Sequence, residues 1–370
     1  MDRVKENVQK VYSALFYTEK FLLFVVVFSL LSGCAFMYWQ SRRIAKPIEE
    51  LSGVSQKLTE RDFSVRAKNY GTYQEISVLA HNFNTMAELI GLAEEKGLPI
   101  HEIVLAREMH DSQQTRESLL LEMEQNWQVM QASIERGIQN SEHSVSGLTG
   151  GDSKRLFAYR QSGYMGEQVL SAAAYAVGIS EVNAVMGRIV ACPTAGSCGI
   201  VPAALYAARE QRDIDDEAII RALFTAAGIG MVIDQNASIA GAEGGCQAEC
   251  GTAAGMAAGA LVELAGGTPS MVGNATALSV KNLLGLVCDP VAGLVEVPCV
   301  KRNGFAVVEA MLAADMTLAG IKSFIPVDEV IEAMNRIGKA LPKSLRETSE
   351  GGLAVTKTAR AAERRIYPQG

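Results

Sequence analysis

The stretch TAAGMAAGALVELAG, residues 252–266, decides the fold class of this chain. Alanine, leucine and methionine favour helix, and the stretch shows no alternation typical of a strand. Residues 166–189 and 215–233 have the same Gly- and Ala-rich character and are set apart by short breaks at Gly and Pro. We therefore predict a mainly α fold, in which small side chains let helices approach closely.

The composition restricts what this chain does. Of its 370 residues, 48% are hydrophobic and 20% are charged, so a large core is expected. The net charge of −7, without a long basic run, argues against nucleic acid as a partner. Six of the seven cysteines lie between positions 192 and 299, which suggests metal or redox use in a reducing compartment. All four histidines precede residue 150, which removes most zinc sites and any Ser/His or Cys/His dyad from the later region.

The N-terminal segment, residues 1–41, contains an uncharged run at 21–39. Nineteen such residues are long enough to cross a bilayer as a helix. Tyr38 and Trp39 end the run as an interfacial belt does, and basic residues follow. We expect a membrane anchor here. A cleaved signal peptide fits less well because the run is too long, and a buried core helix is the other alternative.

Residues 42–90 carry two short heptad stripes joined by a connector, 60–74. Such helices cannot bury their stripes alone, so we expect them to dimerise into a small bundle. Together with the preceding span, residues 17–90 resemble a transmembrane helix followed by a HAMP linker of bacterial receptors. The matching elements are Pro47, Glu50–Leu51, RDFSV at 61–65, Glu75–Ile76 and FNTM at 83–86.

The next segment is predicted to be helical as well. Residues 91–109 read as a helix, a Gly-Leu-Pro turn and a second helix. Residues 114–138 are amphipathic, and we expect their apolar stripe to pack in the core. The stripe consists of Met123, Trp127, Met130, Ile134 and Ile138.

Three cysteines, Cys246, Cys288 and Cys299, stand beside Gly, Asp-Pro or Pro, where backbone N–H groups point outward at turns and helix ends. Three thiolates without histidine suit an iron–sulfur cluster with one open, Lewis-acidic iron. The wide spacing of these three cysteines is, taken alone, equally compatible with free thiols buried in the core. We expect the remaining cysteines of this region, Cys192, Cys198 and Cys250, to be small core residues.

Two glycine-rich segments are candidate ligand loops. In CPTAGSCGIVPAAL, 192–205, a turn opens into a helix, and Thr194, Ser197 and free N–H groups form a small anion cradle. An ordinary N-capped helix is the alternative. In GLTGGD, 147–152, the Gly pair allows close backbone approach, and Asp152 is expected to cap the following helix.

These segments, in this order, resemble the α subunit of bacterial iron–sulfur L-serine dehydratase from about residue 90 to 370. The signposts are HEIVLAREM, GLTGGD, EVNAVMGRIVACPTAGSCGIVPA, NASIAGAEGGCQAE, KNLLGLVCDPVAGLVEVPCVKRN and RETSEGGLA. The resemblance implies a helical catalytic domain at 91–370 that converts L-serine to pyruvate and ammonia. It implies a [4Fe-4S] cluster on Cys246, Cys288 and Cys299, substrate contacts at Thr194, Ala195, Gly196 and Ser197, and a separate β subunit as partner.

The remaining expectations concern chemistry and location. Lys154, Lys281 and Lys301 stand in no Schiff-base context, so pyridoxal phosphate is not expected. No residue is assigned as the catalytic base. The catalytic domain is expected in the cytoplasm, on a chain anchored in the inner membrane through 21–39, and a homodimer is expected through 42–90. The alternative function is a membrane signalling protein in which a degenerate lyase domain senses serine or oxygen.

Overall fold

The computed structural model describes residues 86–368, which belong to one compact unit, Thr85–Gly370. The predicted span 21–39 and nearly all of the predicted HAMP-like segment lie outside these residues. The described part is helical, as predicted. It contains no β-strand, and one parallel bridge joins Cys288 to Arg346. Within residues 86–368 no helix is both long and apolar enough to cross a membrane.

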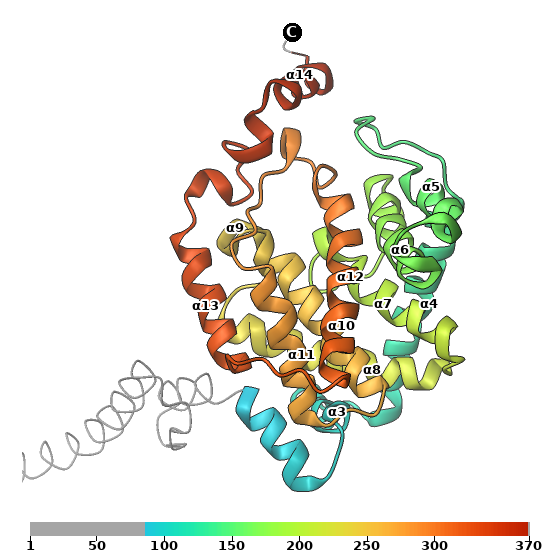
Figure 1. Ribbon diagram of the computed structural model, residues 1–370, viewed down its shortest axis with the longest axis vertical. Coiled ribbons are helices and arrows are strands. Elements are labelled where there is room, and N and C mark those ends of the chain that lie inside the picture. Colours follow the sequence, from blue (N-terminus) through green and yellow to red (C-terminus); the bar gives the residue numbers. More distant parts are fainter. Residues whose placement is uncertain (1–85, 369–370) are drawn as a thin grey trace, which may run out of the picture. The chain divides into compact units, whose positions relative to one another are not determined.

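Twelve labelled α-helices follow an unlabelled helix at 86–96 in the described residues (Figure 1). They are α3 (Ile100–Ser112), α4 (Arg116–Gln139), α5 (Asp152–Tyr159), α6 (Gly166–Ala184), α7 (Ile200–Arg212), α8 (Asp216–Asn236), α9 (Gly241–Gly244), α10 (Thr252–Leu264), α11 (Pro269–Asn282), α12 (Cys299–Leu318), α13 (Val327–Ala340) and α14 (Lys357–Ile366).

Helix α10, which contains most of the stretch 252–266, lies at the centre of the bundle (Figure 1). It packs against α7, α8, α11 and α12. Every residue from Thr252 to Ala260 is buried. A helix surrounded on all sides needs small side chains, and the Gly and Ala residues of this stretch provide them. Helix α6 is buried in the same way along 171–182 and packs against α4, α5, α7 and α12.

Helix α4 confirms the predicted amphipathic stripe. Trp127, Met130 and Ile134 are buried, and the other two stripe residues are partly buried against the same core. The Thr115 hydroxyl accepts the N–H of Ser118 and caps the helix. The polar end of the indole is also satisfied, because Trp127 Nε1 donates to Asp216 Oδ1 at 3.0 Å.

The helix at 86–96 packs into the same core. Met86 is only 1% exposed, and Ala93 is fully buried. A Cβ atom placed on Gly273 of α11 would lie 2.6 Å from Ile90 Cδ1, so the two helices touch closely there. The final turn of the predicted HAMP-like segment is therefore part of the compact unit.

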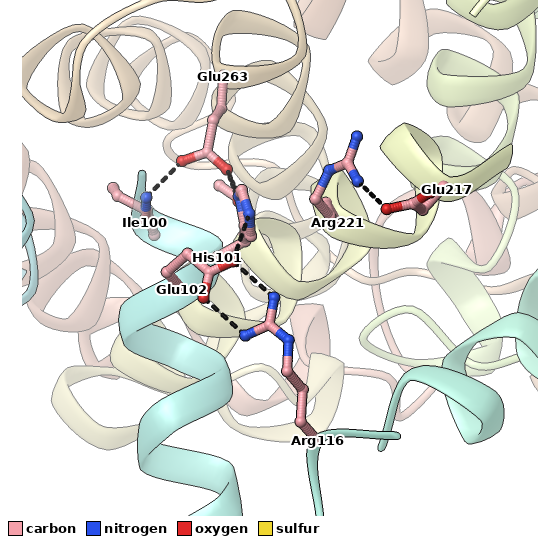
Figure 2. A network of polar contacts seen from close by, with 8 residues as sticks. Ile100, His101, Glu102, Arg116, Glu217, Arg221 and Glu263 are labelled. Carbon is pink, nitrogen blue, oxygen red and sulfur yellow. Dashed lines mark hydrogen bonds and ion pairs between the residues drawn. The ribbon is translucent and has the colours of Figure 1, made fainter. Parts of the chain in front are cut away.

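A buried polar network fastens the start of α3 to α10 (Figure 2). The Glu263 carboxylate of α10 accepts the Ile100 N–H at 2.6 Å and lies 2.8 Å from His101 Nδ1. It also accepts the Thr225 hydroxyl of α8. One residue further along α3, Glu102 forms a bidentate ion pair with Arg116 at the start of α4. The Glu263 carboxylate thus joins three helices, and the Glu102–Arg116 pair adds α4.

Candidate active site

Three segments of the chain bring the predicted cluster cysteines near one another. Cys246 directly precedes the π-helical turn η3 (Gln247–Gly251), Cys288 follows α11 in a loop, and Cys299 is the first residue of α12. All three side chains are buried. Burial, followed by the charge of Cys246, raises the pKa of Cys288, and the same two causes raise the pKa of Cys299 to about 12. The three thiols are therefore close enough to influence one another electrostatically.

The π-helical turn places Cys250 next to Cys246. The two sulfur atoms lie 3.4 Å apart. Their hydrogen bond and the nearby charge of Arg302 lower the pKa of Cys246, whereas the same hydrogen bond and burial raise the pKa of Cys250. Single π-helical turns are frequent at functional sites because they redirect side chains within a helix. Cys250 is buried as expected, but it belongs to the cysteine site rather than to a distant part of the core.

Glu249 is a site residue that the sequence analysis missed. Its Oε1 accepts the Thr194 hydroxyl at 2.8 Å, and its Oε2 lies 3.9 Å from Cys288 Sγ. Burial raises the pKa of this carboxyl group. Two glycines make room for it: a Cβ on Gly196 would lie 3.0 Å from Oε1, and a Cβ on Gly241 would lie 2.7 Å from Oε2. The sequence signal was an acid among small residues, three positions after Cys246.

The predicted ligand turn lies beside this carboxylate. It folds as the 3-10 turn η2 (Ala195–Ser197), with reciprocal capping between Thr194 and Ser197. The Ser197 N–H donates to the Thr194 carbonyl at 3.3 Å. The Gly199 N–H donates to Asn303 Oδ1 at 3.0 Å. With the Thr194 N–H, which donates to the Ser197 hydroxyl, three amides of the expected cradle are therefore used inside the protein. The turn opens into α7, as predicted.

The tail of the chain covers Cys288. The Cys288 N–H donates to the Leu345 carbonyl at 2.9 Å, and the Cys288 carbonyl accepts the Glu347 N–H at 2.8 Å. Asp289 accepts the Leu353 N–H at 2.7 Å and forms an ion pair with Arg302 at 3.0 Å. The RETSEGGLA motif is thus hydrogen-bonded to the loop that carries Cys288.

The prediction that Asp152 caps α5 was wrong. The N-cap position is Gly151, at φ +73°, and no side chain of that residue can cap the helix. Glu181 of α6 accepts the N–H groups of Asp152 and Ser153 instead, at 2.8 and 3.2 Å. Asp152 is free to pair with Lys301, which follows Cys299 on α12. A carboxylate at a helix N-terminus is favourable wherever in the chain it originates.

The fold and the site define a helical protein with a buried, cysteine-rich centre beside a Ser/Thr turn. Comparisons with known proteins agree. The family model described as serine dehydratase alpha chain matches residues 95–354, and the HAMP domain model matches residues 39–90. The chain belongs to the serine dehydratase alpha chain family and is a lyase.

Several curated relatives are similar over most of the compact unit. The probable L-serine dehydratase alpha chain of Bacillus subtilis is 52% identical over 281 residues, covering 75% of this chain and 93% of the relative. The L-serine dehydratase alpha chain of Peptoniphilus asaccharolyticus is 44% identical over 284 residues, covering 76% and 97%. L-serine dehydratase TdcG of Escherichia coli is 41% identical over 239 residues, covering 62% of this chain and 52% of the relative.

Proposed function

We propose that this chain deaminates L-serine to pyruvate and ammonia with a [4Fe-4S] cluster held by Cys246, Cys288 and Cys299. The observation that carries the proposal is the meeting of these three buried thiols at the ligand turn, in a chain of the serine dehydratase alpha chain family. The match with this chain spans almost the whole length of two relatives that are named L-serine dehydratase alpha chain, one of them as probable.

The donor set suits a cluster better than a single ion. Within the described residues, no group of three or more His, Cys, Asp or Glu side chains is arranged to hold a metal ion. In a cluster each thiolate binds a different iron atom, so the ligands stand farther apart than around one ion. The donors are soft thiols, and the Cys-bearing region contains no histidine. With three protein ligands, the cluster supplies one open, Lewis-acidic iron.

The residues of this chain have three tasks in the reaction. The turn Thr194, Ala195, Gly196 and Ser197 receives the substrate, with the N–H groups of Ala195 and Gly196 as its donors. Glu249 holds the turn by accepting the Thr194 hydroxyl. The loop 345–353 closes over Cys288 and excludes water. Serine then loses its Cα proton and its β-hydroxide, and the aminoacrylate tautomerises to an imine that water hydrolyses to pyruvate and ammonia.

A separate chain completes the enzyme in this proposal. The Escherichia coli relative, L-serine dehydratase TdcG, extends well beyond its match, which covers 52% of it, whereas the Bacillus subtilis alpha chain is 93% covered. We place the additional part on a β subunit and the proton acceptor within the assembled site. The catalytic unit is placed in the cytoplasm, with the chain anchored through 21–39 and paired through its HAMP-like segment.

The test is anaerobic reconstitution of the full chain with iron, sulfide and the second chain. We expect a visible absorbance from the cluster and pyruvate formation from L-serine. Cys246→Ser, Cys288→Ser and Cys299→Ser should each abolish both signals. Cys192→Ser is the matched control, because Cys192 is a buried thiol that this proposal does not place among the ligands. Full activity in any one of the three variants would falsify the cluster assignment.

The HAMP match at 39–90 favours a second candidate, in which the lyase domain senses serine or oxygen for a signalling assembly. The same reconstitution separates the two functions. A chain that forms the cluster together with its partner but makes no pyruvate from L-serine supports the sensor. Pyruvate formation at the level of a working lyase excludes it as the main function.

A further inference from the structure

Asn303 occupies a position between the ligand turn and the cysteine site. It lies on α12, one helical turn after Cys299, and its side chain is fully buried. Its amide oxygen accepts the Gly199 N–H at 3.0 Å. Its amide nitrogen donates to the Gly196 carbonyl at 2.8 Å and to the Cys299 carbonyl at 2.9 Å. One carboxamide therefore binds the turn segment at Gly196 and at Gly199, and also the main chain of a cysteine.

These three partners determine how the carboxamide is oriented. Two carbonyl groups require the NH2 group, and one N–H group requires the oxygen, so the reverse orientation would place like groups together. A buried amide that satisfies two carbonyl acceptors and one N–H donor is costly to disturb. The side chain thus sets the distance from the turn to the first residue of α12.

The surroundings leave the turn little freedom to move on its own. A Cβ atom on Gly199 would lie 2.2 Å from the Ala176 carbonyl oxygen of α6, so the turn already presses against that helix. A Cβ on Gly304, next to Asn303, would lie 3.0 Å from Val177 Cγ2. On its other side, the turn is held by the hydrogen bond from Thr194 to Glu249. The turn is thus packed against α6 and hydrogen-bonded to Glu249, and Asn303 connects it to α12 by hydrogen bonds.

We propose that Asn303 is a positioning residue that aligns the ligand turn 194–199 with Cys299. L-serine bound by the turn is thereby held at the correct distance from the cluster. This inference rests on the proposed function. Asn303 itself touches neither serine nor the cluster. Its effect is on the affinity for substrate and on the geometry of the complex, not on the assembly of the cluster.

The most informative variant is Asn303→Ser. Cys299 is four residues before Asn303, and a serine hydroxyl in a helix commonly donates to the carbonyl four residues earlier. Serine therefore keeps the local bond to Cys299 but reaches neither Gly196 nor Gly199. Asn303→Asp is the second variant, because it is isosteric and keeps an acceptor for Gly199 but loses both donors. Asn335→Asp is the control. Asn335 lies on α13 and also donates to a main-chain carbonyl, that of Asn236, at 2.9 Å.

The experiment measures two quantities on the reconstituted holoenzyme with its second chain. One is the visible absorbance per chain, which reports the cluster, and the other is the midpoint of the change in that spectrum as L-serine is added. We expect Asn303→Ser and Asn303→Asp to keep the absorbance, and to raise the serine midpoint and KM by about tenfold or more, as misplacement by a fraction of an ångström implies. Asn335→Asp should match the wild type.

Each outcome has a definite meaning. A variant that is merely less stable loses absorbance and kcat in proportion but keeps the serine midpoint, and that result would overturn the positioning role. An unchanged midpoint at full absorbance would overturn it as well. Should Asn303→Asp fail to fold, Asn303→Ser decides alone. A wild type with neither absorbance nor pyruvate formation would overturn the proposed function, and the role of Asn303 with it.

Discussion

At the level of single residues, Glu309 is a partly buried acid outside the cysteine site. It lies on α12, and its Oε1 has no hydrogen-bond partner among the described residues. Burial raises its pKa from 4.5 to about 7, partly offset by a hydrogen bond with Asn282. Because the folded pKa lies above the unfolded one, the unfolded chain releases this proton more easily. Stability is therefore lost as pH rises from about 4.5 to 7.

We predict that Glu309→Gln removes this loss of stability, because glutamine does not ionise. The variant should gain stability over the wild type as pH rises, by about 2 kcal/mol between pH 5 and pH 8. Urea unfolding of both proteins at four pH values in this range measures the difference. A difference that stays constant across pH would show that the Glu309 carboxylate is solvated in the folded state.

At the level of elements, α4 and α6 cross at a pair of glycines. A Cβ atom on Gly137 would lie 2.5 Å from the Gly178 carbonyl carbon, which is too close for any side chain. The main chains of the two helices are in direct contact there. Helix α6 also supplies Glu181, which caps α5, so this crossing sets the position of three helices.

We predict that Gly137→Ala destabilises the protein by about 1 to 3 kcal/mol, because the added methyl group forces the backbones apart. The matched control is Gly91→Ala in the helix at 86–96, where nothing lies within 4 Å of the added Cβ. That change should be neutral or stabilising by up to about 1 kcal/mol through helix propensity. Chemical unfolding midpoints test both, and equal effects at the two sites would contradict the close crossing.

Glu263 is the residue on which the attachment of α3 depends (Figure 2). We predict that Glu263→Ala costs about 2 to 4 kcal/mol, because it leaves the Ile100 N–H, His101 and Thr225 buried without their acceptor. The matched control is Glu217→Ala, since the Glu217 side chain is 78% exposed in its pair with Arg221. Such a surface pair contributes about 0.5 kcal/mol or less. Thermal unfolding compares the two variants, and similar losses would show that the network is not a buried anchor.

At the level of the whole molecule, the compact unit begins before the end of the HAMP match. The match runs to residue 90, whereas the unit starts at Thr85 and buries Met86 in its core. Residues 86–90 of this helix thus belong to the HAMP match by sequence and to the compact unit by packing. A truncation that removes the HAMP-like segment therefore affects the compact unit differently according to whether the cut falls before or after this helix.

We predict that deletion of residues 1–84 leaves the melting temperature of the catalytic unit unchanged, whereas deletion of residues 1–90 lowers it. The longer deletion removes Met86 and Ile90 from their contacts, and loss of one such buried side chain costs about 2 to 5 kcal/mol. Calorimetry of the two truncated chains measures this. Equal melting temperatures would show that the helix at 86–96 does not contribute to the stability of the unit.

The sequence by itself determined the helices, and it predicted that Cys246, Cys288 and Cys299 share one site. Helices α4, α6, α8 and α10 follow from local periodicity and small-residue composition, and the turn before α7 follows from its Pro, Gly and Ser residues. These features are local, because the hydrogen bonds of a helix join residues four apart. The three cysteines were found through their motifs, since their separations of 42 and 11 positions carry little information on their own.

Only the tertiary structure decided which side chains surround that site. Glu249 meets Thr194 across 55 positions, Asn303 meets Gly199 across 104, and Glu181 caps α5 from 29 positions away. No local pattern encodes these pairs, because each depends on how two helices pack and which face each presents. For the same reason Asp152, the expected cap, pairs with Lys301 instead. The local sequence selects the elements of this protein, and the packing of its helices selects the partners of its polar groups.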